Sequence, residues 1–265
     1  MPDYLELTYI QVGLAALLIL INAGISLGLR LGLEKSLAVA SVRTIVQLGL
    51  IGIVLEWVFR RNQPSVVLAV ILFMTVVAGL TAVSRLHRRY DGIWINTLCS
   101  MWISSWFVGI YALLFVFRGI EPWYQPQYLI PILGMILGNT LNGISIGLDT
   151  ILDSFATKRR EIESRLALGA TRWEASRLEI QRAVRSGMIP IINSMMIVGL
   201  VSLPGMMTGQ LLSGTRPVEA IKYQIAIMFL IASATALGTV LTVMLASLRL
   251  LNKQHQLEFR RIRQR

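Results

Sequence analysis

Several polar residues, a proline–glycine pair and two methionines stand inside long apolar segments of the chain, and they could line a path for a solute. A polar group is costly in such surroundings, so each one needs a physical reason to be there. Arg43 could instead extend its guanidinium to the edge of its segment, and the asparagines could join two helices by hydrogen bonds. The candidates for such a path are Arg43, Gln47, Asn139, Asn142, Pro204, Gly205, Met206 and Met207.

The segment around Pro204 carries the most informative of these signals. Pro204 removes a helical hydrogen bond and Gly205 frees the backbone, so a broken helix is predicted there. Helices broken at membrane depth survive where protein or a water-filled cavity accepts the exposed backbone. The thioethers of Met206 and Met207 suit soft ions such as Cu(I), whereas Fe(III) and Al(III) prefer oxygen ligands. Because methionine is also a common packing residue, the metal ligands stay unassigned.

The composition determines the kind of solvent in which these residues lie. The chain has 265 residues, of which 55% are hydrophobic and 15% charged, with a mean hydropathy of +0.65. A soluble domain needs more charge to cover its surface. The net charge of +11 would indicate nucleic acid in a soluble protein, but here it fits the positive-inside rule and attraction to anionic lipid. We therefore predict a multi-pass protein of the cell (plasma or inner) membrane that does not bind nucleic acid.

Hydropathy predicts an all-α polytopic fold with about seven transmembrane helices in one membrane domain covering residues 1–265. Helices are the form expected because lipid offers the backbone no hydrogen-bond partner. Lys and Arg gather in the connections on one side and in the C-terminal tail, which predicts the N-terminus outside and the C-terminus inside. One long loop, 150–189, then faces the cytoplasm. The expected spans are 9–29, 37–59, 65–84, 93–117, 128–149, 190–214 and 223–248.

The loop at 150–189 has the pattern of two helices joined by a glycine turn. Gly169 is expected to end the first helix. Thr171 and Glu174 form a capping box that begins the second, which should run to about Met188, before Pro190 opens the next span. The pattern fits helices lying on lipid and equally a helix presented to a partner's groove. The apolar residues expected on one face of the first helix are Leu152, Phe155, Ile162 and Leu166.

Residues 163–171, ESRLALGAT, resemble the EAA-xxx-G loop of ABC transporter permeases, the element that docks on the ATPase. The glutamate, the glycine and the Ala-Thr after it match, while Ser164 and Arg165 stand where the pattern has alanines. The resemblance implies that ATPase coupling involves Glu163, Leu166, Gly169, Ala170 and Thr171.

Two longer segments resemble the FetB/YbbM family (UPF0014), and the similarity extends over residues 37–248. They are IPILGMILGNTLNGISIGLD at 130–149 and VGLVSLPGMMTGQLLSGTRPVEAIKYQIAIMF at 198–229. The resemblance implies the permease subunit of an ABC system for iron export in bacteria or aluminium tolerance in plants. Such a permease has no ATPase domain, and no G-x-x-x-x-G-K-[ST] phosphate loop occurs here. We therefore expect no enzymatic activity and no cofactor in this chain, a separate ABC ATPase subunit that uses ATP, and at least two copies of the chain.

The main alternative function is an ion-coupled secondary transporter of a metal or small solute. Such a protein usually needs acidic residues near the middle of its spans. Glu56 and Asp149 both lie at the ends of predicted spans, so the ABC permease is the preferred interpretation. No residue selects one transported substrate over another.

Overall fold

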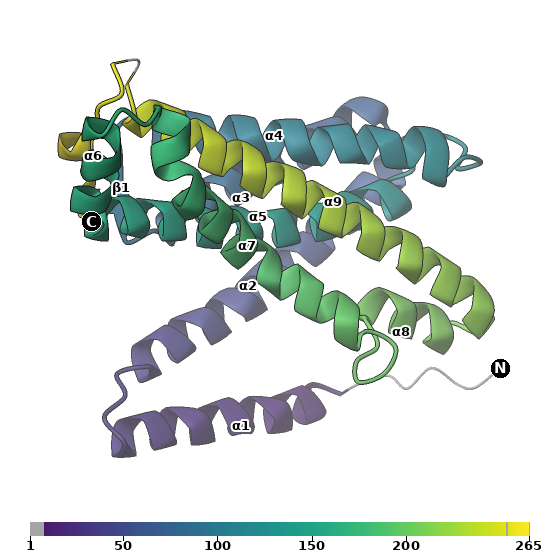
Figure 1. Ribbon diagram of the computed structural model, residues 1–265. Helices are drawn as coiled ribbons and strands as arrows, with labels where there is room; N and C mark the ends of the chain where they lie inside the picture. The colour runs from purple at the N-terminus through teal and green to yellow at the C-terminus, as the bar shows by residue number, and fades with distance from the viewer. Residues whose placement is uncertain (1–7, 253, 265) are drawn as a thin grey trace. The chain divides into compact units, whose positions relative to one another are not determined.

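The computed structural model describes residues 8–252 and 254–264, and it is helical almost throughout (Figure 1). The chain divides into two compact units. One contains residues up to Gln63 together with Leu212–Gly214, and the other contains Pro64–Leu211 and the residues from Thr215 onward. The all-α, polytopic fold expected from the sequence is confirmed.

The first unit is a pair of long helices, α1 (Tyr9–Gly28) and α2 (Glu34–Arg61). A capping box begins α1, because the Thr8 backbone N–H donates to Gln11 Oε1 at 2.7 Å while Thr8 Oγ1 accepts from the Gln11 N–H. The turn between the helices is held by Ser26, whose hydroxyl donates to Glu34 Oε2 at 3.0 Å.

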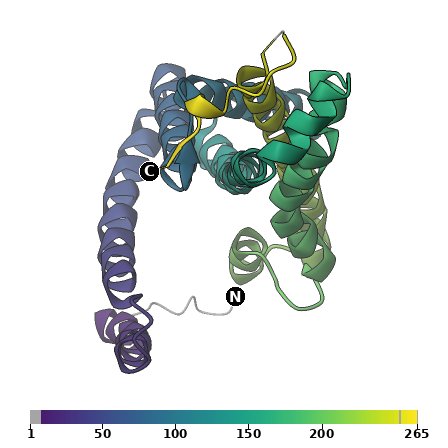
Figure 2. The same cartoon turned by 60° about the vertical axis from the view of Figure 1, so that its left-hand side comes forward.

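The second unit is a bundle in which α5 packs against four other long helices. Figure 2 shows α5, in teal, nearly end-on among its neighbours. Short elements complete the unit at its ends. The long helices are α3 (Pro64–Ser84), α4 (Ile93–Tyr111), α5 (Pro126–Thr157), α7 (Arg172–Ile197) and α9 (Pro217–Leu250). The short elements are β1 (Arg88–Arg89), the π-helical turn η1 (Ala112–Val116), α6 (Arg159–Ala167), α8 (Gly205–Leu212), the 3-10 helix η2 (Phe259–Arg261) and β2 (Arg263–Gln264).

Helices α5, α7 and α9 approach one another closely at two glycines. A Cβ atom added to Gly187 of α7 would lie 2.6 Å from the carbonyl oxygen of Gly143 in α5. One added to Gly143 would lie 2.7 Å from Thr239 Oγ1 in α9. No other residue type leaves room for backbones at this separation, so Gly187 marks the point where α7 crosses the bundle.

Six helices in the described part of the chain are long and apolar enough to cross a membrane, which confirms six of the predicted spans and a multi-pass protein. They are α1, α2, α3, α4 with η1, α5 and α9. The seventh predicted span, over 190–214, is not among them because it is not one continuous helix, and the broken helix predicted around Pro204 is confirmed. Helix α7 ends at Ile197 and α8 begins at Gly205, with Gly199 at φ +82° between them. Pro204 ends this non-helical segment, as its missing N–H predicts.

The segment 150–189 contains the predicted glycine turn between two helices, but most of it belongs to helices that continue into the bundle. Helix α5 extends to Thr157 and α7 begins at Arg172, so α6 and two short connections are all that lie between them. The expected end near Met188 is wrong, because α7 continues through Pro190. It loses one hydrogen bond there, and the Ser194 hydroxyl donates to the Pro190 carbonyl at 2.9 Å.

Candidate functional site

The connection from α6 to α7, which we call the α6–α7 turn (residues 168–171), has a fixed backbone. The Ala170 N–H donates to the Arg165 carbonyl at 3.1 Å and the Gly169 N–H to the Leu166 carbonyl at 3.0 Å. This Schellman motif needs a left-handed residue, and Gly169 supplies it at φ +94°. The predicted end of the helix at Gly169 is confirmed.

The predicted capping box at the start of α7 is confirmed as well. The Thr171 N–H donates to Glu174 Oε2 at 2.8 Å, and the Glu174 N–H donates to Thr171 Oγ1 at 3.3 Å. The hydrogen bond from the Thr171 hydroxyl, with a smaller contribution from its backbone N–H, holds the pKa of Glu174 below its ordinary value. Both ends of the α6–α7 turn are therefore closed by hydrogen bonds.

A buried carboxylate joins α6 to α7. The side chain of Glu179 in α7 is fully buried, and Oε2 lies 3.3 Å from Arg165 Nη1 while Oε1 lies 3.7 Å from Lys158 Nζ. Arg165 also donates to the Ala175 carbonyl at 2.9 Å and pairs with Glu161 on its own helix, as the i,i+4 spacing allows. A buried charge is tolerated when it is paired in this way, so Arg165 and Glu179 hold α6 in place.

The apolar residues predicted on one helical face do lie together, but on two helices. Lys158 separates α5 from α6, so the face is not that of a single helix. Leu152 and Phe155 at the end of α5 and Ile162 in α6 are fully buried in one core cluster, and Leu166 packs against it. This core fixes α6 on the end of the bundle.

The residues predicted for ATPase coupling lie on and beside the α6–α7 turn. Gly169 and Thr171 are exposed, Ala170 packs partly against the core, and Leu166 faces the core more than the surface. Glu163 pairs with Arg159 at 2.7 Å on the exposed side of α6. Sequence reasoning missed Leu168, which is 87% exposed, and Trp173, which is 48% exposed. The sequence signal that could have identified them is the presence of an apolar residue on each side of the glycine turn.

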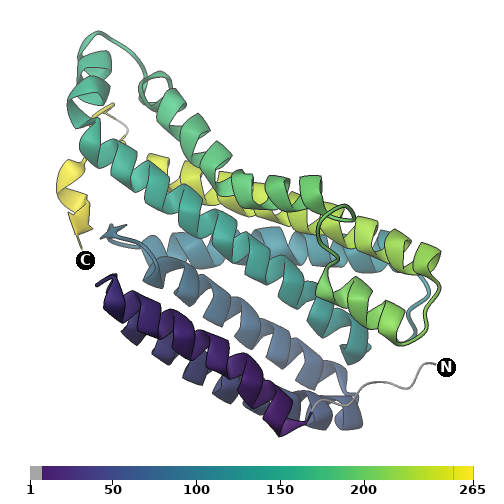
Figure 3. The same ribbon diagram turned by 90° about the horizontal axis from the view of Figure 1, so that it is seen from below.

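The C-terminal segment crosses the same end of the second unit, as Figure 3 shows. Strand β2 pairs antiparallel with β1, placing Arg263 opposite Arg89. The Arg172 N–H at the start of α7 donates to His255 Nδ1 at 2.9 Å, and the Arg159 guanidinium lies 4.8 Å from the centre of the Phe259 ring. The segment thus contacts the α3–α4 connection, α6 and α7.

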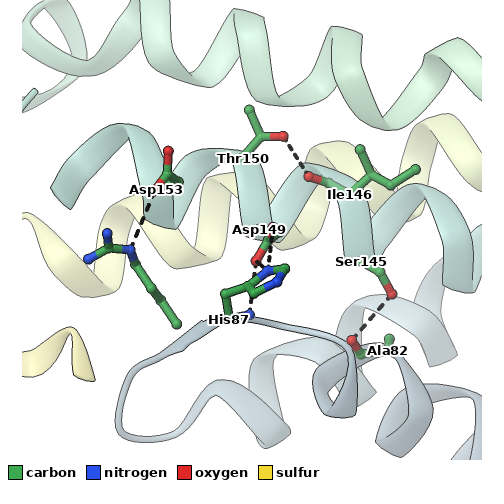
Figure 4. Close-up of polar contacts among 8 residues, drawn as sticks. Ala82, His87, Ser145, Ile146, Asp149, Thr150 and Asp153 are labelled. Carbon is green, nitrogen blue, oxygen red and sulfur yellow. Dashed lines mark hydrogen bonds and ion pairs between the residues drawn. The ribbon is translucent and has the colours of Figure 1, made fainter. Parts of the chain in front are cut away.

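Carboxylates on α5 hold the α3–α4 connection (Figure 4). The His87 N–H donates to Asp149 Oδ1 at 3.1 Å, and its ring Nδ1 lies 3.2 Å from Oδ2 of the same carboxylate. Arg88 Nε lies 3.5 Å from Asp153 Oδ1. Nearer the middle of the helix, the Ser145 hydroxyl donates to the Ala82 carbonyl at 3.2 Å. Asp149 therefore has a structural partner, His87, on the α3–α4 connection.

The candidate path residues are not gathered into one site by the contacts within either unit. In the first unit, Arg43 and Gln47 are exposed on α2. In the second, the Asn139 amide donates to a carbonyl of its own helix, and exposed Asn142 accepts from Arg85 Nη1 at 2.8 Å. Pro204 precedes α8, where Gly205 is exposed, Met206 half-buried and Met207 buried. Among the described residues, no group of three or more His, Cys, Asp or Glu is placed to hold a metal ion.

Buried hydroxyls inside the second unit form a polar feature that sequence reasoning missed. Five threonines on α4, α5 and α9 are fully or almost fully buried, and their hydroxyls have no hydrogen-bond partner within the described part of the chain. Leaving such groups unpaired is costly. The five threonines are Thr97, Thr140, Thr235, Thr239 and Thr242. The close spacing of the three on α9 is visible in the sequence.

A hollow of about 580 Å³ lies at the opposite end of the second unit, between the η1–α5 connection and the start of α9. Lys222 pairs with Glu219 at its edge at 2.9 Å, and Phe117 stacks on Tyr223 with ring centres 5.3 Å apart. Arg118 and Glu121 add one charge of each sign. This lining suits a polar solute more than an apolar one.

Comparison with known proteins places the chain among membrane proteins of one family. The model of the uncharacterised protein family UPF0014 matches residues 9–251, a wider region than the sequence resemblance covered. The UPF0014 membrane protein slr1647 of Synechocystis sp. is 40% identical over 231 residues, covering 86% of this chain and 87% of its own length. No solved structure matches.

Two further relatives have names that refer to metals. The probable iron export permease protein FetB of Escherichia coli is 32% identical over 253 residues, covering 95% of each chain. Protein ALUMINUM SENSITIVE 3 of Arabidopsis thaliana is 31% identical over 244 residues, covering 92% of this chain and 88% of its own.

Proposed function

This chain belongs to the UPF0014 family of membrane proteins, and from that membership we propose that it is the membrane-spanning permease subunit of an ABC transporter that exports metal ions. A separate ATPase subunit binds and hydrolyses ATP, and two or more copies of this chain form the membrane part. Iron is the first candidate substrate because a relative aligned along 95% of this chain is named a probable iron export permease.

The observation that carries the proposal is the α6–α7 turn. An element that transmits movement from a partner must keep its shape under load, and this one is fixed by a Schellman motif, a capping box and the buried Glu179. It also presents Leu168, an apolar side chain that is 87% exposed, within a polar surface. An apolar anchor inside a polar rim is the usual composition of a protein interface.

Helix α7 links this turn to the interior of the second unit. It is one continuous helix from Arg172 to Ile197, crosses α5 and α9 at Gly187, and ends at the non-helical segment 198–204. Movement of the turn is therefore carried past the buried threonine hydroxyls. When the helices separate, those hydroxyls can donate to water and accept hydrogen bonds from the water shell of a hydrated cation, and this supports a polar path in that region.

The ion-coupled secondary transporter is less well supported. Among the described residues, Glu179 is the one carboxylate that is buried, and it is paired with Arg165 and Lys158 beside α6. Asp149, eight residues before the end of α5, contacts His87. Neither acid is available near the middle of a span, where proton or sodium coupling needs one.

The test is metal transport in inside-out membrane vesicles from cells that express the chain with its ATPase subunit. We expect uptake of Fe(II) that requires ATP, and we expect Leu168→Asp to reduce it at least tenfold while the chain still inserts and folds. Thr157→Asp, which adds the same charge at an exposed position outside the turn, should leave uptake unchanged.

Three outcomes would contradict the proposal in different ways. Uptake driven by a proton gradient without ATP would favour the secondary transporter. ATP-driven uptake of a solute other than a metal would overturn the substrate and keep the permease. Equal transport by Leu168→Asp and the parent chain would remove the α6–α7 turn from the coupling surface.

A further inference from the structure

A basic hollow of about 420 Å³ lies between α6 and the first half of α7. None of its lining residues belongs to the exposed α6–α7 turn, although the same two helices flank both. Four of its seven lining residues are Lys or Arg, and one is acidic. The residues that line it are Lys158, Glu161, Arg165, Leu178, Gln181, Arg182 and Arg185.

The cations of the hollow are of two kinds. Lys158 and Arg165 are paired with the buried Glu179, and their side chains are only 31% and 26% exposed. Arg182 and Arg185 are exposed on α7 and have neither an ion pair nor a hydrogen bond to any residue that the structure describes. The hollow therefore has a fixed wall and two free guanidinium groups.

The same face of α7 changes from basic to apolar along the helix. Residues 182, 185, 189, 192 and 196 follow at intervals of three and four, which places them on one side. Arg182 and Arg185 are followed by Ile189, Ile192 and Met196, which are 48%, 45% and 71% exposed. Arg185 and Ile189 are four residues apart, or about 6 Å along the helix. An exposed cation pair thus stands directly beside an exposed apolar stripe.

We propose that this face binds an anionic phospholipid. The phosphate lies in the hollow against Arg182 and Arg185, because guanidinium groups donate two parallel hydrogen bonds to a phosphate. An acyl chain lies along Ile189, Ile192 and Met196. A free phosphate would contact the cations but not the apolar stripe, and an aspartate or glutamate side chain of a partner protein would contact neither the stripe nor all the donors. The inference does not depend on the transported substrate.

The test measures binding of short-chain phosphatidylglycerol to the purified chain in a zwitterionic detergent, by calorimetry. Phosphatidylcholine of the same chain length and inorganic phosphate serve as comparison ligands. We expect phosphatidylglycerol to bind more tightly than either. Because each basic residue near an anionic lipid contributes about fivefold in affinity, Arg182→Gln with Arg185→Gln should weaken binding about 25-fold.

The matched control is Arg177→Gln, which removes the same charge from an exposed position of α7 outside the hollow. It should leave the affinity within twofold of the parent. Ile189→Gln with Ile192→Gln should weaken binding of the lipid and leave that of inorganic phosphate unchanged. Helix content and melting temperature, measured in phosphatidylcholine, check that each variant is folded. If the double arginine variant is not folded, the single change Arg185→Gln takes its place, and it should weaken binding about fivefold.

The inference is overturned if the double arginine variant binds phosphatidylglycerol as the parent does. It is overturned equally if Arg177→Gln weakens binding as much, because the effect would then be that of net charge. Inorganic phosphate that binds as tightly as the lipid would show a site for a soluble anion. Transport that fails while lipid binding persists would reject the proposed function and leave this inference standing.

Discussion

Nη1 of Arg165 in α6 lies 3.3 Å from Oε2 of Glu179 in α7, and the carboxylate that it meets is fully buried. The two residues are 14 positions apart and on different helices. The same nitrogen donates to the Ala175 carbonyl, so the Arg165 side chain binds both the Glu179 carboxylate and the backbone of α7. The position of α6 on the bundle depends on this contact.

Removing the arginine should therefore destabilise the protein more than removing a surface charge. Arg165→Met leaves Glu179 buried with Lys158 as its remaining partner, and breaking a buried pair costs about 3–5 kcal/mol. Because Arg165 is partly exposed, we expect the lower end of that range. Arg160→Met, at an exposed position of α6, is the control. Equal melting temperatures for the two variants in detergent would refute the role given to the pair.

Gly169→Ala should destabilise through the backbone alone. The residue has φ +94°, and no atom lies within 4 Å of an added Cβ, so the penalty is conformational and amounts to about 1–2 kcal/mol. Gly205→Ala is the matched control, since that position also has open space and does not have a positive φ. A melting temperature that falls for Gly205→Ala but not for Gly169→Ala would contradict the Schellman motif.

Gly187→Ala should destabilise through overpacking at the helix crossing. The new Cβ would lie 2.6 Å from a backbone oxygen of α5, which cannot move aside without shifting a helix, and such strain costs about 1–3 kcal/mol. Gly138→Ala in α5 has no atom within 4 Å and should stabilise the helix by about 0.5–1 kcal/mol. Thermal unfolding of both variants checks the opposite signs.

The start of α7 should loosen in acid. The hydrogen bonds from Thr171 lower the pKa of Glu174, so the stabilisation is present above the ordinary carboxyl pKa of 4.5 and is lost as the pH falls through the lower folded value. Hydrogen exchange of the Thr171 amide, corrected for the intrinsic pH dependence, should accelerate over that interval. Glu174→Gln keeps an acceptor that does not titrate, and protection that still changes in this variant would assign the effect to another group.

The α3–α4 connection should be sensitive to strong base. Burial raises the pKa of Tyr90 to about 12, against the opposing effects of the hydrogen bond from Asn96 and the charge of Arg249. Folding therefore favours the neutral phenol. Its contribution, about 3 kcal/mol at most, is complete below pH 10 and is lost as the pH rises through about 12. The difference in tyrosinate absorbance between the parent and Tyr90→Phe, measured against pH, gives the titration of Tyr90 directly. A midpoint near pH 10 would contradict the claim that burial raises its pKa.

Most local signals in the sequence predicted the structure correctly, except that α7 continues past Met188 and Lys158 interrupts the first helix, whereas contacts between distant residues were not predicted. Hydropathy located six spans, and Gly169 with the Thr171–Glu174 box marked where two helices end and begin, because these depend on neighbouring residues. The i,i+4 spacing of Glu161 and Arg165 favours their ion pair but gives no sign of Glu179. The pairing of β2 with β1 joins segments more than 170 residues apart, which no local pattern encodes.

The seventh span shows the limit of hydropathy taken alone. Averaged over a window, residues 190–214 are apolar enough for one crossing, but an average does not register where the backbone must turn. The local signal of Pro204 and Gly205 did predict a break, whereas nothing in the sequence placed the end of α7 at Ile197, before Gly199 at φ +82°. The candidate path residues could not be assigned because their partners depend on how the helices pack, and polarity inside a span fits either packing or transport.

The unbroken length of α7 has a geometric consequence for any tilt of this helix. Gly187, where α7 crosses α5, lies about 22 Å from Arg172 and about 15 Å from Ile197 at 1.5 Å per residue. If α7 tilts as one body about this crossing, its two ends move in opposite directions, the end at Ile197 through about two-thirds of the distance. A displacement of the α6–α7 turn would then reach the segment at 198–204 reduced and reversed in direction.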